Sequence, residues 1–297
     1  MDLRVSTCPN KYGEKVVIRI IDNSNSLLTF EGLGLSSDVR ERMVQLCSQP
    51  YGIILVTGPT GSGKSSTLYS MLTHINSPLV NICTVEDPIE FNLKGVNQFQ
   101  VHDKIGLTFA SVLRTLLRQD PDVIMLGEVR DPETAAIAVQ AALTGHLVLS
   151  TLHTNDAPGA ITRLENLSVE PYLISAALVG IVAQRLVRRV CPDCATEVEP
   201  TARMRQAADR GGVQLDKVFV GRGCSQCNQT GLKGRGGIYE ILVPDDEMRS
   251  AIAGGANLGA LRNLAKQSGM QTLFEYGLDK VRQQETTMEE VLRVTCE

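Results

Sequence analysis

Residues 53–66 read Ile-Ile-Leu-Val-Thr-Gly-Pro-Thr-Gly-Ser-Gly-Lys-Ser-Ser. An apolar run ends at Thr57, and residues 58–65 then fit the phosphate-loop spacing G-x-x-x-x-G-K-[ST]. The apolar run predicts a buried strand, and the apolar residues after the loop recur at helical spacing as Leu68, Met71, Leu72 and Ile75. A strand, a glycine-rich loop and a helix in this order predict an NTP-binding site.

The residues of this loop each have a physical reason to be there. Glycines at 58, 61 and 63 allow tight turns, so that successive backbone N–H groups converge on a polyphosphate. Lys64 supplies a cation for the β- and γ-phosphates, and the Ser65 hydroxyl can coordinate Mg²⁺. The helix that follows points its positive end at the same anion. We therefore expect the nucleotide to be bound by Gly58, Pro59, Thr60, Gly61, Ser62, Gly63, Lys64, Ser65 and Ser66.

The composition of the whole chain narrows the class of protein. The 297 residues are 43% hydrophobic and 21% charged, as expected for an ordinary globular protein of about two domains. Only 4% are aromatic and the net charge is −4, which argues against a nucleic-acid partner. No apolar stretch reaches the length of a membrane span, and the N-terminus lacks a secretory apolar segment. We expect a cytoplasmic protein that meets a membrane only through partners.

Predicted strands and helices alternate from residue 53 to about residue 154, as in a parallel α/β sheet. We expect strands over 53–57, 81–85, 122–126 and 146–151, and helices over 108–118, 132–143, 157–167 and 172–187. Another strand, near a sheet edge, is expected over 15–21. Thr286, followed three residues later by Glu289, predicts a capping box for the last helix.

Two carboxylates and two histidines are candidates for chemistry at the phosphates. Hydrolysis of an NTP needs an acid that holds Mg²⁺ or its water, and a base that orients the attacking water. Glu86 and Glu128 each follow a predicted strand, and we favour Glu86 as the base, with Glu128 as the open alternative. His146 and His153 flank another strand, and we expect both to hydrogen-bond the γ-phosphate or the acids that face it.

Four of the eight cysteines form two C-x-x-C pairs, Cys191 with Cys194 and Cys224 with Cys227. A pair of such knuckles predicts one structural Zn²⁺ held by four thiolates, although the intervening residues 195–223 form a longer gap than usual. Disulfides and an empty reduced site remain as alternatives. The other four are expected to be reduced bystanders: Cys8, Cys47, Cys83 and Cys296.

Four sequence blocks in a fixed order resemble the secretion ATPases of type II secretion and type IV pilus assembly, the GspE/PilB group. Residues 58–65 match the Walker A loop, and residues 84–90 (Thr-Val-Glu-Asp-Pro-Ile-Glu) match the family's Asp box. Residues 126–131 (Leu-Gly-Glu-Val-Arg-Asp) match its atypical Walker B, and residues 144–154 match its His box. The likeness extends through the tetracysteine segment to the C-terminus.

This resemblance implies a RecA-like ATPase that uses ATP and Mg²⁺ and assembles as a homohexamer. It further implies work on pilins or pseudopilins through the cytoplasmic parts of inner-membrane platform proteins, at the cytoplasmic side of the bacterial inner membrane. In such rings, arginines from a preceding domain reach toward the phosphates, and Arg4 and Arg19 match those positions. Such guanidinium groups would neutralise charge on the transferred phosphoryl group. Ordinary edge-strand arginines are the alternative interpretation.

The resemblance also suggests a division of the chain. We expect a remnant of an N-terminal (N2-type) domain over 1–30, a RecA-like core over 31–189, a tetracysteine zinc subdomain over 190–240 and a helical C-terminal subdomain over 241–297. Family members carry further domains before this point, so the chain is either truncated or a naturally short member. Whether it forms rings alone is open.

Two alternative functions stay open at this point, as does the role of one basic run. A DNA-translocating or conjugation-type ATPase is disfavoured by the acidic net charge and the few aromatic residues. An NTP switch without turnover is disfavoured by the presence of Glu86, Glu128 and both histidines. The basic run over 185–189 could contact acidic lipid or a partner, or could be a solvated helix face.

Overall fold

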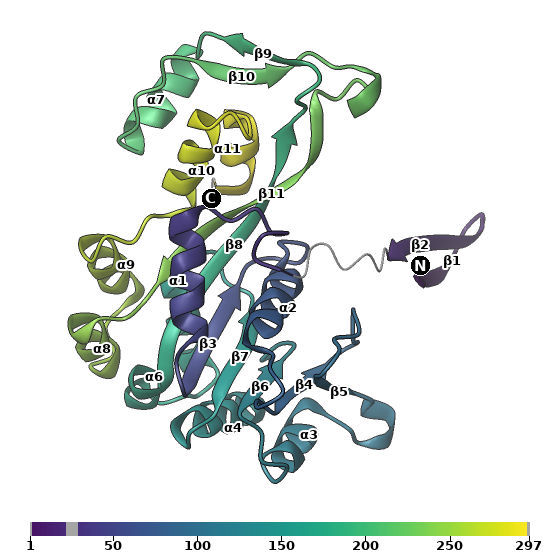
Figure 1. Ribbon diagram of the computed structural model, residues 1–297, viewed down its shortest axis with the longest axis vertical. Helices are drawn as coiled ribbons and strands as arrows, with labels where there is room; N and C mark the ends of the chain where they lie inside the picture. Colours follow the sequence, from purple (N-terminus) through teal and green to yellow (C-terminus); the bar gives the residue numbers. More distant parts are fainter. Residues whose placement is uncertain (1, 22–28, 296–297) are drawn as a thin grey trace.

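The chain folds around one seven-stranded mixed sheet, which a computed structural model describes for residues 2–21 and 29–295. Helices flank this sheet (Figure 1). The spatial order of the strands is β11 (Leu232–Leu242), β8 (Leu178–Val190), β3 (Gly52–Thr57), β7 (Leu147–Leu152), β6 (Val123–Leu126), β4 (Ile82–Glu86) and β5 (Asn97–Gln100).

The central strands are parallel and fully buried. β3 pairs in parallel with β7 and β8, while β4 pairs in parallel with β5 and β6, and only β11 runs antiparallel to its neighbour β8. Every residue of β3, β4, β6 and β7 is buried, as expected for a sheet covered on both faces. The carboxyl ends of β3, β7, β6 and β4 therefore meet at one edge of the sheet.

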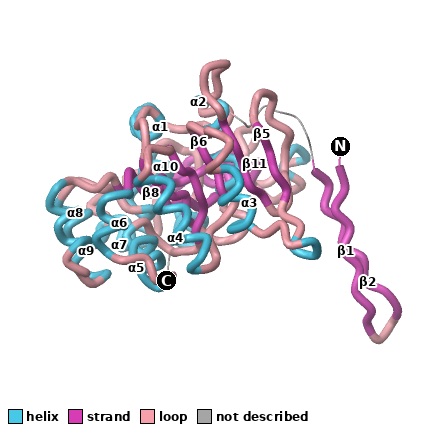
Figure 2. Tube along the Cα trace, turned by 90° about the horizontal axis from the view of Figure 1, so that it is seen from below, coloured by secondary structure: helices cyan, strands magenta, loops and turns pink. Residues whose placement is uncertain are grey.

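Helices from the sequence between the strands cover both faces of the sheet. In Figure 2, α1 (Ser37–Cys47) and α2 (Lys64–Ile75) lie on one side of the strands, and α4 (Pro132–Leu143) and α6 (Pro171–Ala177) lie on the other. The first part of the chain also includes α3 (Phe109–Leu116), α5 (Pro158–Asn166) and the short 3₁₀ helix η2 (Asp103–Ile105). The α/β fold with a parallel core is confirmed.

Most of the predicted elements are confirmed, and one helix is wrong. The strands expected over 53–57, 81–85, 122–126 and 146–151 are β3, β4, β6 and β7. The helix expected over 172–187 ends at Ala177, and the chain continues as β8. The residues of β8 include the β-branched Val179, Ile181 and Val182, and the strand pairs with β3 on one side and β11 on the other.

The tetracysteine segment extends from the end of β8, at the top of Figure 1. It contains β9 (Ala195–Val198), α7 (Ala202–Arg210), β10 (Val218–Gly221) and the 3₁₀ helix η3 (Ser225–Cys227). β9 and β10 form a separate antiparallel pair, and β11 then returns to the main sheet. Because β11 runs across residue 240, the subdomain boundaries at 190 and 240 stay predictions.

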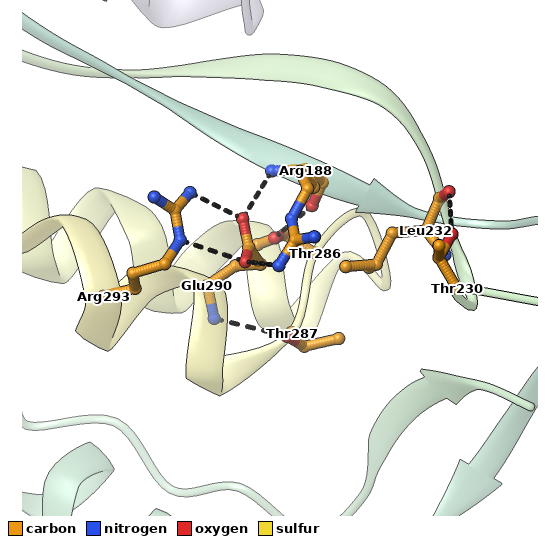
Figure 3. A network of polar contacts seen from close by, with 7 residues as sticks. All are labelled: Arg188, Thr230, Leu232, Thr286, Thr287, Glu290 and Arg293. Atoms are coloured by element: carbon orange, nitrogen blue, oxygen red, sulfur yellow. Dashed lines mark hydrogen bonds and ion pairs between the residues drawn. The ribbon is translucent and has the colours of Figure 1, made fainter. Parts of the chain in front are cut away.

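Helices form the C-terminal part, as predicted: α8 (Asp246–Ala253), α9 (Leu258–Gln267), α10 (Leu273–Arg282) and α11 (Met288–Thr295). The predicted capping box at Thr286 is wrong, because the Thr286 hydroxyl donates to the Arg188 carbonyl of β8 at 2.8 Å. The hydroxyl of Thr287 instead accepts from the Glu290 N–H at 3.3 Å (Figure 3). Across the described ranges 2–21 and 29–295, no helix combines the length and apolar character that crossing a bilayer requires.

The N-terminal residues form an antiparallel hairpin of β1 (Asp2–Asn10) and β2 (Gly13–Ile21). The strand expected over 15–21 is thus present. Arg4 and Arg19 are paired in the backbone register of this hairpin. Their side chains lie outside the part of the structure that is described, so their role stays a prediction.

Candidate nucleotide site

The phosphate loop joins the carboxyl end of β3 to the start of α2. Gly63 caps α2 with φ 89°, and no side chain caps this helix, so its first N–H groups are free for an anion. Gly58 has φ 151°, and a Cβ added there would lie 2.5 Å from the Gln184 carbonyl oxygen of β8. Only glycine allows this close approach of loop and strand. The loop therefore has the shape and the donors that a polyphosphate needs.

Lys64 and Ser62 add side-chain groups to the backbone donors of the phosphate loop. The Lys64 Nζ donates to the carbonyl oxygens of Gly58 at 2.8 Å and Pro59 at 3.1 Å, within its own loop. Burial lowers the pKa of Lys64, while the nearby Glu128 carboxylate opposes this shift. The Ser62 hydroxyl is buried and is the one buried side-chain N or O group without a hydrogen-bond partner within the described ranges. Such an orphaned donor fits a site completed by a ligand.

A cavity of about 580 Å³ opens in front of the loop and contains most of the predicted residues. Its lining includes Thr60 to Ser66 of the loop and helix, Glu86 from the end of β4, Glu128 after β6 and His153 after β7. These side chains come from distant parts of the sequence and meet because the parallel strands end at the same edge. The Ser65 hydroxyl and the Glu128 carboxylate are oxygen ligands of the kind that Mg²⁺ prefers.

Glu86 ends β4 with its carboxylate buried and held by three donors. Oε1 accepts from the Thr84 hydroxyl at 2.7 Å and from the Gln98 side-chain amide at 3.0 Å. Oε2 accepts from the hydroxyl of Tyr69, a residue of α2. Three donors from three elements leave this carboxylate little freedom to rotate.

Glu128 follows β6 and is only 13% exposed. Its Oε1 pairs with the Arg130 guanidinium, and its Oε2 lies 3.8 Å from Nε2 of His153. Burial and the Lys64 cation lower the pKa of His153, which favours a neutral imidazole at pH 7. A neutral imidazole can donate one hydrogen bond to a carboxylate or a phosphate without adding charge.

The prediction that His146 lies beside the phosphates is wrong. His146 precedes β7, and its carbonyl accepts from the N–H of Gly52 at the start of β3. The imidazole Nδ1 lies 3.0 Å from the Ala141 carbonyl oxygen at the end of α4. The two histidines are at opposite ends of a six-residue strand. Only His153 is therefore at the carboxyl edge where the cavity lies.

The interpretation of the basic run as a helix face is also wrong, since these residues belong to β8. Arg185 is buried, and its guanidinium donates to the Asn155 carbonyl at 3.0 Å and its side-chain oxygen at 3.2 Å. Arg188 pairs with Glu290, and Arg189 lies 3.8 Å from Glu285. The run therefore connects β8 to other elements within the chain.

Several residues at the site were not identified from the sequence. Tyr69 and Gln98 hold Glu86, while Arg235 of β11 and Leu186 of β8 line the cavity. Tyr69 lies within the apolar helical pattern of α2, and Gln98 lies in a polar strand, so neither stands out in a single sequence. The pairing of β8 with β3 and of β11 with β8, which brings Arg235 to the cavity, is long-range.

The four predicted cysteine ligands converge on one point. Their four Sγ atoms lie within 4.8 Å of one another. The separations are 3.9 Å for Cys191–Cys224, 3.8 Å for Cys194–Cys227 and 3.7 Å for Cys224–Cys227. A tetrahedral Zn²⁺ with Zn–S bonds of about 2.3 Å places its sulfur ligands about 3.8 Å apart. The geometry fits a closed four-thiolate zinc site.

Backbone N–H groups support one of these thiolates. The Sγ of Cys227 accepts from the N–H groups of Cys224 and Gly231, both at 3.2 Å. Burial acts to raise the pKa of Cys227, but these hydrogen bonds, together with those from the Cys224 and Cys194 thiols, outweigh it and lower the pKa to about 6. By contrast, burial raises the pKa of Cys47 to about 12. Cys8, Cys47 and Cys83 are free, as predicted, and Cys296 lies outside the described residues.

The fold and the site define a P-loop nucleotide-binding protein with a parallel α/β core. The profile of the family described as "Type II/IV secretion system protein" matches residues 1–293. The chain belongs to this family, which confirms the resemblance inferred from its four sequence blocks.

Curated relatives match the whole length of the chain, among them one from a pilus assembly system and one from a secretion system. The chain is 52% identical over 299 residues to the "Type IV pilus assembly ATPase PilB" of Thermus thermophilus, and it spans 34% of that protein. It is 51% identical over 297 residues to the "Type II secretion system protein E" of Aeromonas hydrophila, and it spans 59% of that protein. The chain thus corresponds to one third to three fifths of these relatives.

Among solved structures, the pilus retraction motor PilT with bound ADP is similar over 99% of this chain and 74% of its own, with a TM-score of 0.72 and 30% identity. The Legionella pneumophila ATPase DotB, with a TM-score of 0.69 and 24% identity, covers 98% of this chain and 72% of its own and shares the fold. Both solved structures share the fold of this chain.

Proposed function

We propose that this chain binds ATP with Mg²⁺ and hydrolyses it, with Glu86 as the general base. One observation carries the proposal: a single cavity is lined by Lys64, Ser65, Glu86, Glu128 and His153. These are the parts that phosphoryl transfer needs, namely a cation and helix N-terminus for the phosphates, a carboxylate for the metal and a second carboxylate for the water.

The roles divide between the two carboxylates by their surroundings. Glu86 has neutral donors around it and takes part in no ion pair within the described ranges, so it can serve as the proton acceptor. Glu128 interacts with two cations: it forms an ion pair with Arg130, and its negative charge acts to raise the pKa of Lys64. We assign proton acceptance to Glu86 and metal coordination to Glu128, together with Ser65.

In the reaction, Glu86 would take a proton from the attacking water while the water oxygen bonds to the γ-phosphorus. The bond between the γ-phosphorus and its bridging oxygen breaks, and ADP and phosphate are the products. Lys64 and the N-terminus of α2 would stabilise the negative charge on the phosphates. When bound with the nucleotide, a Mg²⁺ ion that Ser65 and Glu128 would hold would supply charge neutralisation at the phosphates.

We further propose that the chain works as part of a homohexameric motor in a type II secretion system or a type IV pilus machine. Support comes from family membership and from the names of relatives that match the whole chain at about 50% identity. In such a ring, Arg4 and Arg19 would approach the phosphates of a neighbouring subunit. The partners would be cytoplasmic parts of inner-membrane platform proteins, and the location the cytoplasmic side of that membrane.

We also propose that Cys191, Cys194, Cys224 and Cys227 hold one structural Zn²⁺. The sulfur separations and the N–H donors to Cys227 support this assignment. Four thiolates complete a tetrahedral zinc shell, so the metal would have no position for substrate. Its role would be to hold together the ends of β8 and β11.

The test of ATP hydrolysis compares the chain with its Glu86→Gln variant at matched oligomeric mass. We expect Glu86→Gln to bind ATP as tightly as the unmodified chain and to lose at least 100-fold in turnover, within the range that general-base catalysis supplies, roughly 10²–10⁴-fold. Glu41→Gln on the exposed surface of α1 is the matched control and should leave turnover unchanged. Wild-type turnover by Glu86→Gln would overturn the assignment of the base.

A further inference from the structure

Tyr69 connects the phosphate-loop helix to the carboxylate of Glu86. It lies on α2, five positions after Lys64, and is 1% exposed. Its hydroxyl donates to Oε2 of Glu86 and accepts from the N–H of Glu90 at 3.1 Å. The aromatic ring packs edge-on against Phe91, with the ring centroids 5.8 Å apart. One side chain thus contacts the general base and the segment that follows it.

The other donors to Glu86 come from the sheet. Thr84 belongs to β4 itself, and Gln98 belongs to β5, which pairs with β4. Gln98 also donates to the Phe91 carbonyl at 3.0 Å and accepts from the Leu93 N–H at 2.7 Å. Thr84 and Gln98 both donate to Oε1 of Glu86. Among the described contacts, Oε2 therefore accepts a hydrogen bond from Tyr69 alone. The orientation of the carboxylate relative to the phosphate loop therefore depends on the Tyr69 hydroxyl.

We propose that Tyr69 is a positioning residue. Its hydroxyl holds the Glu86 carboxylate in a fixed orientation relative to the phosphate loop, which leads into the helix that carries Tyr69. This inference rests on the proposed function, in which Glu86 accepts the proton of the attacking water. Burial and the hydrogen bond to Glu86 raise the pKa of Tyr69, so its hydroxyl stays protonated and remains a donor. Tyr69 acts through Glu86 and takes no proton itself.

The test is Tyr69→Phe, which removes one hydroxyl and keeps the ring that packs on Phe91. Displacement of a catalytic group can lower the rate by up to about 100-fold, so we expect Tyr69→Phe to lower kcat about 10-fold or more. The KM for ATP should stay within twofold, because Tyr69 is absent from the loop that holds the phosphates. The matched control is Tyr276→Phe, which removes another buried tyrosine hydroxyl, one that donates to Ser36 at 3.0 Å. It should leave kcat unchanged.

A pH profile separates positioning from a structural role. Removing a donor that stabilises the charged carboxylate makes Glu86 easier to protonate, so the acidic limb of the kcat profile should move to higher pH in Tyr69→Phe. The other charged or titratable groups lining the cavity are the same in every variant: Lys64, Asp87, Glu90, Glu128, Arg130, His153 and Arg235. A loss of packing alone would lower kcat at all pH values and leave the limb in place.

The outcomes distinguish this inference from the proposed function. If the unmodified chain does not hydrolyse ATP, or Glu86→Gln hydrolyses it at full rate, the proposed function is wrong. The positioning role of Tyr69, which depends on that function, is then wrong as well. If Glu86→Gln is inactive while Tyr69→Phe keeps both the kcat and the acidic limb of the unmodified chain, only the inference about Tyr69 is overturned. Should Tyr69→Phe fail to fold, 3-fluorotyrosine at position 69 keeps the shape with a stronger donor, and the limb should move to lower pH. An unmoved limb in that protein would also overturn the inference.

Discussion

Replacing Glu290 by Gln should weaken the attachment of the last helix to β8. Glu290 is 3% exposed, and its carboxylate accepts from the Arg188 guanidinium at 2.6 Å, the Arg188 backbone N–H at 3.0 Å and the Arg293 guanidinium at 2.8 Å (Figure 3). Burial acts to raise the pKa of Glu290, but the hydrogen bonds from Arg293 and Arg188 outweigh it and lower the pKa from 4.5 to about 2.

The size of the effect follows from this pKa. A fall from 4.5 to about 2 corresponds to about 3 kcal/mol of stability at about 1.4 kcal/mol per pKa unit. Both arginine side chains are 53% exposed, so solvent screening reduces the gain. We expect Glu290→Gln to lower the free energy of unfolding by about 2 kcal/mol at pH 7. The contribution is fully present above pH 4.5 and disappears as the pH falls through about 2.

The assay is urea denaturation followed by circular dichroism, since the chain has no Trp. Glu289→Gln is the matched control, because Glu289 is exposed on the same helix and the substitution changes the net charge equally. It should cost less than about 0.5 kcal/mol. At pH 3.5 the difference between Glu290→Gln and the unmodified chain should shrink by roughly two fifths. Equal stabilities at pH 7, or a difference that grows on acidification, would show that the ionised Glu290 carboxylate does not stabilise the fold.

Three further outcomes are expected. Elemental analysis of protein purified without chelators should find one zinc per chain, and Cys227→Ser should release it; metal-free protein of unchanged stability would contradict the zinc assignment. Arg19→Ala should lower ATP turnover at least 10-fold in assembled protein and leave monomers unaffected, measured at matched concentrations; an equal loss in monomers would argue against action across a subunit boundary. Gly58→Ala should weaken ATP binding at least 10-fold, because its Cβ would lie 2.5 Å from the Gln184 carbonyl oxygen, and unchanged affinity in a titration would count against the loop geometry.

The nucleotide site could be predicted because its signals are local. The strand before the loop, the loop itself and the following helix are adjacent in the sequence, and each has its own pattern of residues. Glu86, Glu128 and His153 could be placed near the phosphates because each lies at or just after the carboxyl end of a strand, and parallel strands end at one edge. The tetracysteine cluster was found from spacing alone, and the four sulfur atoms do converge.

The errors concern features that long-range pairing decides. Residues 178–187 are apolar enough for a buried helix or a buried strand, and pairing with β3 and β11 makes them β8. His146 was placed on the wrong side because the two ends of a short strand carry equal weight in a sequence pattern, whereas only the carboxyl end of β7 faces the phosphates. Tyr69 was missed because a buried aromatic residue on a helix usually belongs to the core, and its hydroxyl partner is 17 residues away.

A crystal structure of the chain with Mg²⁺ and a non-hydrolysable ATP analogue tests the assignment of the nucleotide site most directly. We expect the γ-phosphate beside Lys64 Nζ, the metal on the Ser65 hydroxyl, and the Glu86 carboxylate facing the phosphate with its Tyr69 contact kept. A triphosphate bound elsewhere, for example in the separate cavity of about 380 Å³ lined by Asn155 and Arg262, would contradict it.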